Sequence, residues 1–101
     1  MTVFQKQESI VGSAINFLSD STFDATLGAN TLIGSAVTVS ARNLDTSEVV
    51  QGSCSVVSAL VVRCAFAGGA LSVGTWEILV TATPPGYQSQ IVAASEWNIK
   101  P

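Results

Sequence analysis

Hydrophobic and polar residues alternate along most of the chain, and this period of two is typical of β-strands that bury one face. The alternation predicts strands over residues 33–42, 50–56, 60–66, 76–82 and 91–99, with a weaker one over 10–17. Residues 20–30 are expected to form a loop, with one short strand at most at 23–27. The expected inward-facing residues are Ile33, Ser35, Val37, Val39 and Ala41; Val50, Gly52, Cys54 and Val56; Leu60, Val62, Cys64 and Phe66; Trp76, Ile78, Val80 and Ala82; and Ile91, Ala93, Ser95, Trp97 and Ile99.

Turn-forming residues separate these strands. Asn and Asp side chains in Asn43–Ser47 cap their own backbone, Gly68–Gly74 forms a longer return, and Pro84-Pro85-Gly86 ends a strand. Ser58-Ala59 reverses the chain, so the flanking runs form a hairpin that places Cys54 opposite Cys64. Six or seven short antiparallel strands in about a hundred residues predict an all-β fold, a single β-sandwich. It is expected to be immunoglobulin-like, without the Cys…Trp…Cys spacing of antibody domains.

Composition narrows the possible partners. The chain has 101 residues, a net charge of −3 and four Lys and Arg against seven Asp and Glu, so we expect no nucleic-acid partner. No apolar run is long enough to cross a bilayer, and the N-terminus lacks a signal-peptide core, so we expect cytoplasmic synthesis and no membrane partner. Charged residues make up 11%, against about a quarter in most soluble proteins, which favours a subunit packed in a homo-oligomer. Residues 1–8 are expected to be an N-terminal arm that orders on docking, and 9–101 the sandwich.

Candidate chemistry is sparse. The chain has no histidine, which removes the commonest base for Ser or Cys nucleophiles and most zinc sites. The sequence therefore predicts no enzyme and no catalytic, cofactor-binding or metal-binding residues. Calcium at Asp20/Asp24 or at Asp45/Glu48 is conceivable, although neither pair has calcium-loop spacing. Cys54 and Cys64 fit either a cross-strand disulfide or two buried thiols, and cytoplasmic synthesis favours the thiols.

Aromatic and aliphatic residues offer the remaining candidates. Pro84-Pro85-Gly86-Tyr87 matches the P-P-x-Y pattern read by WW domains, but a strand-to-strand turn is the favoured interpretation. Trp76 and Trp97 could form a stacking platform, yet both are in phase with the apolar face, which favours the core. Tyr87 is then the better exposed aromatic. Aliphatic residues of the opposite phase are candidates for contacts with other subunits: Val49, Val57, Val61, Leu79 and Val92.

The whole chain resembles a group of short bacteriophage virion proteins. The shared features are Phe4-Gln-Lys6-Gln7, Gly28-Ala-Asn-Thr31-Leu32 before Val37-Thr38-Val39, Val61-Val62-Arg63 running into Gly68-Gly69, and Gly74-Thr75-Trp76 opening a strand that ends Val80-Thr81-Ala82-Thr83. Trp76 stands where this group commonly has tyrosine, and the two cysteines are not expected of it.

The resemblance implies a non-enzymatic structural subunit located on the virion. Its expected partners are other virion proteins, either as a capsid decoration (cement) protein or as a component of the head–tail junction or fibre base. The alternative is a tail or fibre module that recognises host-surface glycans. That alternative predicts exposed aromatic residues near Tyr87 or the Gly68–Gly74 loop.

Overall fold

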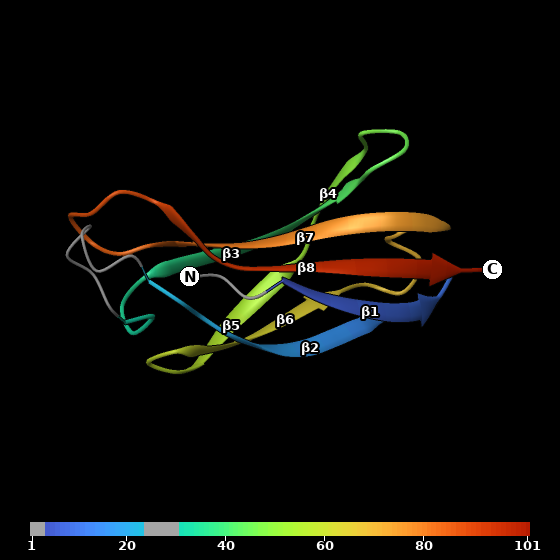
Figure 1. The fold of residues 1–101 in the computed structure, drawn as a ribbon. Helices are drawn as coiled ribbons and strands as arrows, with labels where there is room; N and C mark the ends of the chain where they lie inside the picture. The colour runs from blue at the N-terminus through green and yellow to red at the C-terminus, as the bar shows by residue number, and fades with distance from the viewer. Residues whose placement is uncertain (1–3, 24–30) are drawn as a thin grey trace.

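The chain folds into two β-sheets. A computed structural model describes residues 4–23 and 31–101, and within these ranges it has eight strands and no helix. One sheet has the order β1-β8-β7-β3-β4 and the other β2-β6-β5 (Figure 1). The strands are β1 (Phe4–Ile10), β2 (Ile15–Asp20), β3 (Ala36–Asn43), β4 (Val49–Gln51), β5 (Ser53–Ser58), β6 (Val61–Phe66), β7 (Gly74–Thr83) and β8 (Gln90–Lys100). The predicted all-β class is confirmed, and the arrangement is compatible with a β-sandwich.

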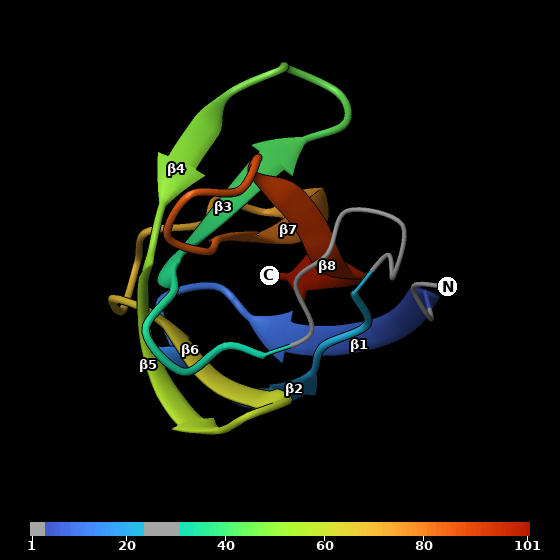
Figure 2. The same ribbon diagram turned by 90° about the vertical axis from the view of Figure 1, so that its left-hand side faces the viewer.

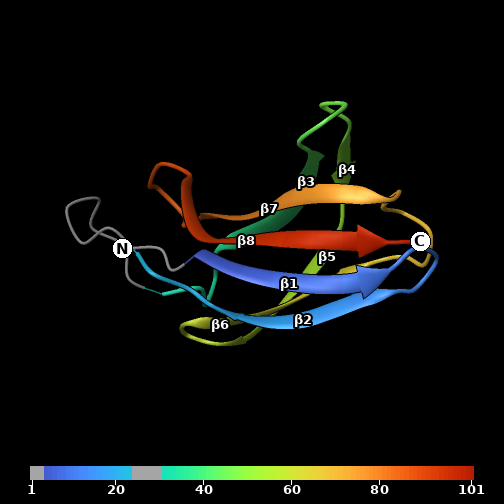
Figure 3. The same cartoon turned by 45° about the vertical axis from the view of Figure 1, so that its right-hand side comes forward.

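The N-terminal part differs from the prediction. A single strand over 10–17 is wrong, because Ile10 ends β1, a turn follows, and Ile15 begins β2 in the other sheet. Gly12 in this turn has φ +89°, a conformation that glycine adopts without steric cost. β1 pairs in parallel with β8, so the fold is not purely antiparallel, and it has more strands than the six or seven expected. The expected arm over residues 1–8 overlaps β1 from Phe4 onward; Figure 3 shows this strand beside β8.

The core lies between the two sheets and follows the predicted alternation. Central strand β7 buries Trp76 and every second residue to Ala82, and β3 buries its aligned neighbours Val39 and Ala41. From the other sheet, β6 contributes Val62, Cys64 and Phe66. All these side chains belong to one buried cluster, so the hydrophobic effect holds the sheets face to face.

A bulge in β8 reverses the predicted facing of two residues. Val80 pairs with Ala93 and Thr81 pairs with Ile91, so Val92 is the extra residue. Val92 is fully buried, whereas Ile91 is 51% exposed. The predictions that Ile91 faces inward and Val92 outward are therefore both wrong, because the bulge shifts the alternation by one residue.

Gly52 marks the point where the chain passes from one sheet to the other, between β4 and β5 (Figure 2). Its N–H donates to the Val39 carbonyl at 3.0 Å. A Cβ at this position would lie 2.5 Å from the Ala65 carbonyl oxygen and 2.9 Å from both Phe66 and Val39 side-chain carbons. Gly52 faces inward as predicted, and the crossing requires a residue without a side chain.

The strand predicted from residue 33 begins later, at Ala36. The Ser35 N–H donates to the Leu32 carbonyl at 3.0 Å across a turn in which Gly34 has φ +81°. Leu32 is therefore the buried residue here, and Ile33 is exposed, contrary to its predicted inward position. The 23–27 strand expected in the preceding loop lies outside the described residues beyond Phe23.

Connections gather at the two ends of the molecule. The segment after Thr31, the β5–β6 turn and the β7–β8 loop lie at one end (Figure 1). There the Leu32 N–H donates to the Ala59 carbonyl at 2.7 Å, and the Thr22 N–H donates to the Val92 carbonyl at 2.9 Å. None of the described residues forms a helix long and apolar enough to cross a membrane.

Candidate interaction surfaces

Cys54 and Cys64 lie opposite each other, as predicted. They are paired across β5 and β6, and their Sγ atoms are 3.6 Å apart and unbonded. Cys64 is fully buried, while Cys54, on the edge strand, is half-buried. Burial raises the pKa of both thiols above the ordinary value, so both are protonated near neutral pH.

The candidate calcium pairs do not form a cluster in the part of the chain that the structure describes. There, no three Asp, Glu or Cys side chains are close enough to hold a metal ion. Asp45 and Glu48 are exposed in the β3–β4 hairpin, and Asp24 lies outside the described residues. The side chain of buried Asn43 stabilises this hairpin, because its Oδ1 accepts hydrogen bonds from the N–H groups of Asp45 and Thr46 at 2.8 and 3.1 Å.

Both tryptophans lie in the core, as the favoured interpretation predicted. Trp76 and Trp97 are paired across β7 and β8, and both are buried. The Trp76 Nε1–H donates to the Ser72 carbonyl at 2.8 Å, which ties the Gly68–Gly74 return to the core. A stacking platform would need the exposed face of a ring, and buried Trp76 offers none.

Pro84–Tyr87 forms a turn, the interpretation favoured over a WW-binding motif. The Tyr87 N–H donates to the Pro84 carbonyl at 3.1 Å, and Gly86 has φ +78°, a pattern typical of a type II turn with proline at its second position. The Tyr87 side chain is half exposed, as predicted. The turn shape is incompatible with the extended polyproline conformation that WW domains read.

Of the five aliphatic residues predicted to face outward, two are clearly exposed. Val49 on β4 and Val57 on β5 are more than half exposed, while Val61 and Leu79 are half-buried and Val92 is buried by the bulge. Val57 is the unpaired residue of a second bulge, between Val56 and Ser58.

The prediction missed several exposed apolar side chains, among them Leu18. Four residues predicted to face inward are exposed, so those predictions are wrong: Ile33, Val56, Leu60 and Ile91. Leu18 could have been found, because Ile15 and Phe17 alternate inward and leave Leu18 outward once β2 is recognised. The exposure of Ile33, Leu60 and Ile91 depends on the turn before β3, the tight β5–β6 turn and the β8 bulge, and Val56 directly precedes the β5 bulge. None of these has a clear signal in the alternation.

The edges of the three-stranded sheet carry almost no charge. β2 and β5 are its two edge strands. β5 has no charged residue and no proline, and β2 has only Asp20, at its end. Edge strands usually carry charges or prolines that discourage pairing with another chain, and here a bulge at Val57 is the main obstacle. We call β2 and β5 with their exposed Leu18, Val56 and Val57 the apolar edges.

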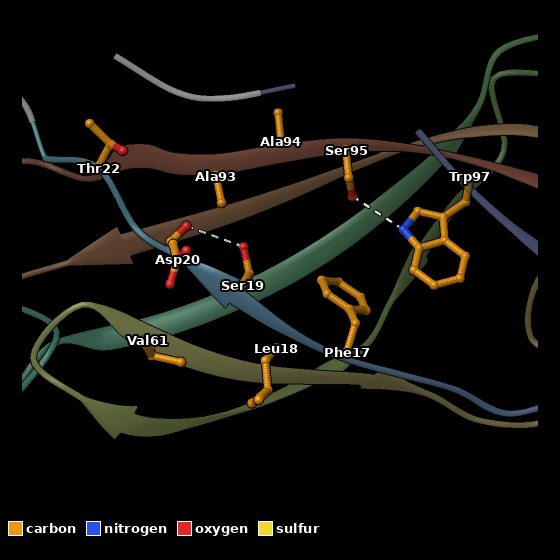
Figure 4. A pocket seen from close by; sticks show the side chains of 10 residues that line it. All are labelled: Phe17, Leu18, Ser19, Asp20, Thr22, Val61, Ala93, Ala94, Ser95 and Trp97. Carbon is orange, nitrogen blue, oxygen red and sulfur yellow. Dashed lines mark hydrogen bonds between the residues drawn. The ribbon is translucent and has the colours of Figure 1, made fainter. Parts of the chain in front are cut away.

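A groove of about 430 Å³ lies between β2 and β8 (Figure 4). Phe17 and Trp97 form one wall, with ring centroids 5.5 Å apart and planes inclined by 42°. The Trp97 Nε1–H donates to Ser95 Oγ at 3.2 Å. Among the described residues that line the groove, Asp20 is the one titratable residue, and these residues supply no acid–base pair.

Comparison with known proteins gave no match: no protein family, curated protein or solved structure is significantly similar to the chain.

Proposed function

We propose that this chain is a non-enzymatic structural protein of a bacteriophage particle, with an immunoglobulin-like β-sandwich fold. In this proposal it attaches to the virion in many copies, as a capsid decoration subunit or at the head–tail junction, through protein–protein contacts alone. The observation that carries the proposal is the pair of apolar edges, because uncharged edge strands with exposed aliphatic side chains suit pairing with a neighbouring subunit.

The strand order supports the immunoglobulin-like part. In such domains strands B, E and D form one sheet and strands C, F and G form the other, with a C′ strand added in variable-type domains. If β2 is taken as strand B, the three-stranded sheet reads B-E-D, and β8-β7-β3-β4 reads G-F-C-C′. The departure is β1, which pairs with β8 rather than with β2 as strand A would. Both cysteines lie in the three-stranded sheet, so they cannot form the antibody inter-sheet disulfide, and a Phe17–Trp97 ring contact links β2 to β8 across the sheets.

The proposed virion location rests on the sequence resemblance and on the hydroxyl-rich outer side of the five-stranded sheet. The outward-facing side of the five-stranded sheet is rich in hydroxyl groups, including those of Thr38, Ser40 and Thr81. Within the described residues, two ion pairs join strands of this sheet, Arg42–Glu77 at 3.7 Å and Glu8–Lys100 at 3.0 Å, and because they are at least partly exposed each contributes little to stability. A hydroxyl-rich surface on a chain with 11% charged residues is suited to close packing among repeated subunits, where each contact is small and the number of copies provides the strength.

Quantitative mass spectrometry of gradient-purified particles tests the virion location. We expect peptides of this chain at a fixed ratio to the most abundant capsid protein, retained after a high-salt wash. Recovery of the chain only in the soluble fraction of the infected cell would refute the proposal.

A charge placed on the apolar edge tests how the chain attaches. Val57 on β5 is 54% exposed, and Val73, in the β6–β7 loop, is 49% exposed. We expect Val57→Lys to reduce the copies per particle at least tenfold and Val73→Lys to leave them unchanged. Equal incorporation of both variants would show that the apolar edge is not the contact.

Glycan recognition by a tail or fibre module is the second candidate, and half-exposed Tyr87 favours it. This function predicts that the isolated domain binds a bacterial surface polysaccharide and that Tyr87→Ala abolishes binding. Absence of the chain from tail or fibre fractions would exclude this candidate while leaving capsid decoration intact.

A further inference from the structure

We propose that Cys54 and Cys64 form an oxidation site, at which a small disulfide oxidant converts the two thiols into a disulfide between β5 and β6, with Cys54 reacting first. The inference rests on the position of the two side chains and does not depend on the proposed function.

The two cysteines are already placed to react. They are directly paired across adjacent strands, and their Sγ atoms are 3.6 Å apart. Directly opposed positions in an antiparallel pair bring the two Cβ atoms close to the separation that a disulfide spans. Bond formation therefore requires only a small movement of the two sulfur atoms and no change of strand register.

The order of reaction follows from exposure. β5 is an edge strand, and Cys54 on it is half-buried, whereas β6 is the central strand of its sheet and Cys64 is fully buried. Cys54 is therefore the more accessible of the two residues, and we expect a solvent oxidant such as oxidised glutathione to react there first. Burial raises the pKa of both thiols, so the thiolate is scarce near neutral pH and the reaction is slow.

The chemistry balances in two exchange steps. In the first, the Cys54 thiolate attacks one sulfur of oxidised glutathione; a bond forms between Cys54 Sγ and that sulfur, and the other glutathione leaves as a thiolate. In the second, the Cys64 thiolate attacks Cys54 Sγ and releases the remaining glutathione. Two cysteine thiols are oxidised to one disulfide, one oxidised glutathione is reduced to two thiols, and the two protons lost by the cysteines are taken up by the leaving groups.

Closing this bond links residues 54–64 in a ring that persists in the unfolded chain. A cross-link of this length reduces the freedom of the unfolded state and so stabilises the folded one. We expect the thermal unfolding midpoint of the oxidised protein to lie about 10 °C above that of the reduced protein.

Tryptic mapping of the full-length protein tests the proposal. Trypsin cleaves after Arg42 and Arg63, so Cys54 and Cys64 fall in different peptides that only a disulfide can join. After the folded protein is incubated with oxidised glutathione and quenched in acid, we expect one joined peptide from monomeric protein and no retained glutathione. Separate peptides that each carry glutathione, or a disulfide confined to dimers, would overturn the proposal.

Single variants test the order of reaction. We expect Cys64→Ala to accumulate a stable glutathione adduct at Cys54, and Cys54→Ala to react at least tenfold more slowly while folded. Comparable adduct formation in both folded variants would contradict the assigned order. If either variant does not fold, the wild-type time course provides the test, because the first adduct must map to Cys54 and adduct on Cys64 would contradict the order.

Discussion

Replacing Gly52 with alanine should destabilise the protein strongly, because no space exists for the added methyl group. The new Cβ would lie 2.5 Å from the Ala65 carbonyl oxygen, a backbone atom that cannot move without disturbing the β5–β6 ladder. It would also lie 2.9 Å from side-chain carbons of Phe66 and Val39. Overpacking of this kind costs about 3 kcal/mol, which for a domain of this size lowers the unfolding midpoint by about 15 °C.

Gly69→Ala is the matched control for Gly52→Ala. Gly69 has φ +79° and nothing within 4 Å of a built Cβ, so alanine there meets only backbone strain of about 1 kcal/mol. Urea unfolding followed by the fluorescence of the buried Trp76 and Trp97 measures both variants. If the free energy of unfolding of Gly52→Ala lay within about 0.5 kcal/mol of the wild-type value, the chain could not cross between the sheets as tightly as described at Gly52.

Three further outcomes are expected from unfolding experiments. Val92→Lys should lower the free energy of unfolding by about 4 kcal/mol and Ile91→Lys by less than about 0.5 kcal/mol, because the bulge buries Val92 and exposes Ile91. The reverse order in urea titrations would show that the strand alternates without a bulge. Asn43→Ala should lower the free energy of unfolding by about 2 kcal/mol, because two N–H groups of the turn lose their acceptor. Ser47→Gly should raise it by about 1 kcal/mol, because Ser47 has φ 64°, which glycine adopts without strain. Equal unfolding midpoints for wild type and both variants in thermal melts would contradict these expectations. The free energy of unfolding should fall as the pH rises above about 9, and it should fall less in Cys64→Ala. Burial raises the pKa of the Cys64 thiol, so above this pH the unfolded chain releases a proton that the folded chain keeps. Identical pH profiles for wild type and Cys64→Ala would refute this expectation.

Alternation predicted the fold well where strands are long and have one buried face. Every second residue is buried as expected from Trp76 to Ala82 on β7 and from Val62 to Phe66 on β6. A one-residue shift of either strand would turn these side chains toward water. The facing of Cys54 and Cys64 followed from the same logic, because a short turn between two alternating runs determines their register.

The errors arose where the backbone departs from regular pleating. A bulge adds one residue without any fixed composition, so nothing in Ile91-Val92-Ala93 indicated which residue would be extra. The turn containing Gly12 split an expected strand in two and sent the halves to different sheets. Parallel pairing of β1 with β8 joins the two ends of the chain, and local patterns carry no information about such a distant partner.

The proposed contact surface could be predicted only in part. Val57 was identified by its phase, whereas Val56 was predicted to face inward and Leu18 was not identified. The absence of charge along a whole edge became significant only when β2 and β5 were placed at the edges of one sheet. Edge position depends on strand order, which is a property of the whole fold.

Hydrogen–deuterium exchange of the chain, free and assembled on purified particles, tests most directly whether the apolar edges make the contacts. We expect backbone amides of β2 and β5 to exchange at least tenfold more slowly on the particle, while those of the exposed β3–β4 hairpin keep their rates. Unchanged exchange in β2 and β5, with protection confined to other elements, would contradict attachment through these edges.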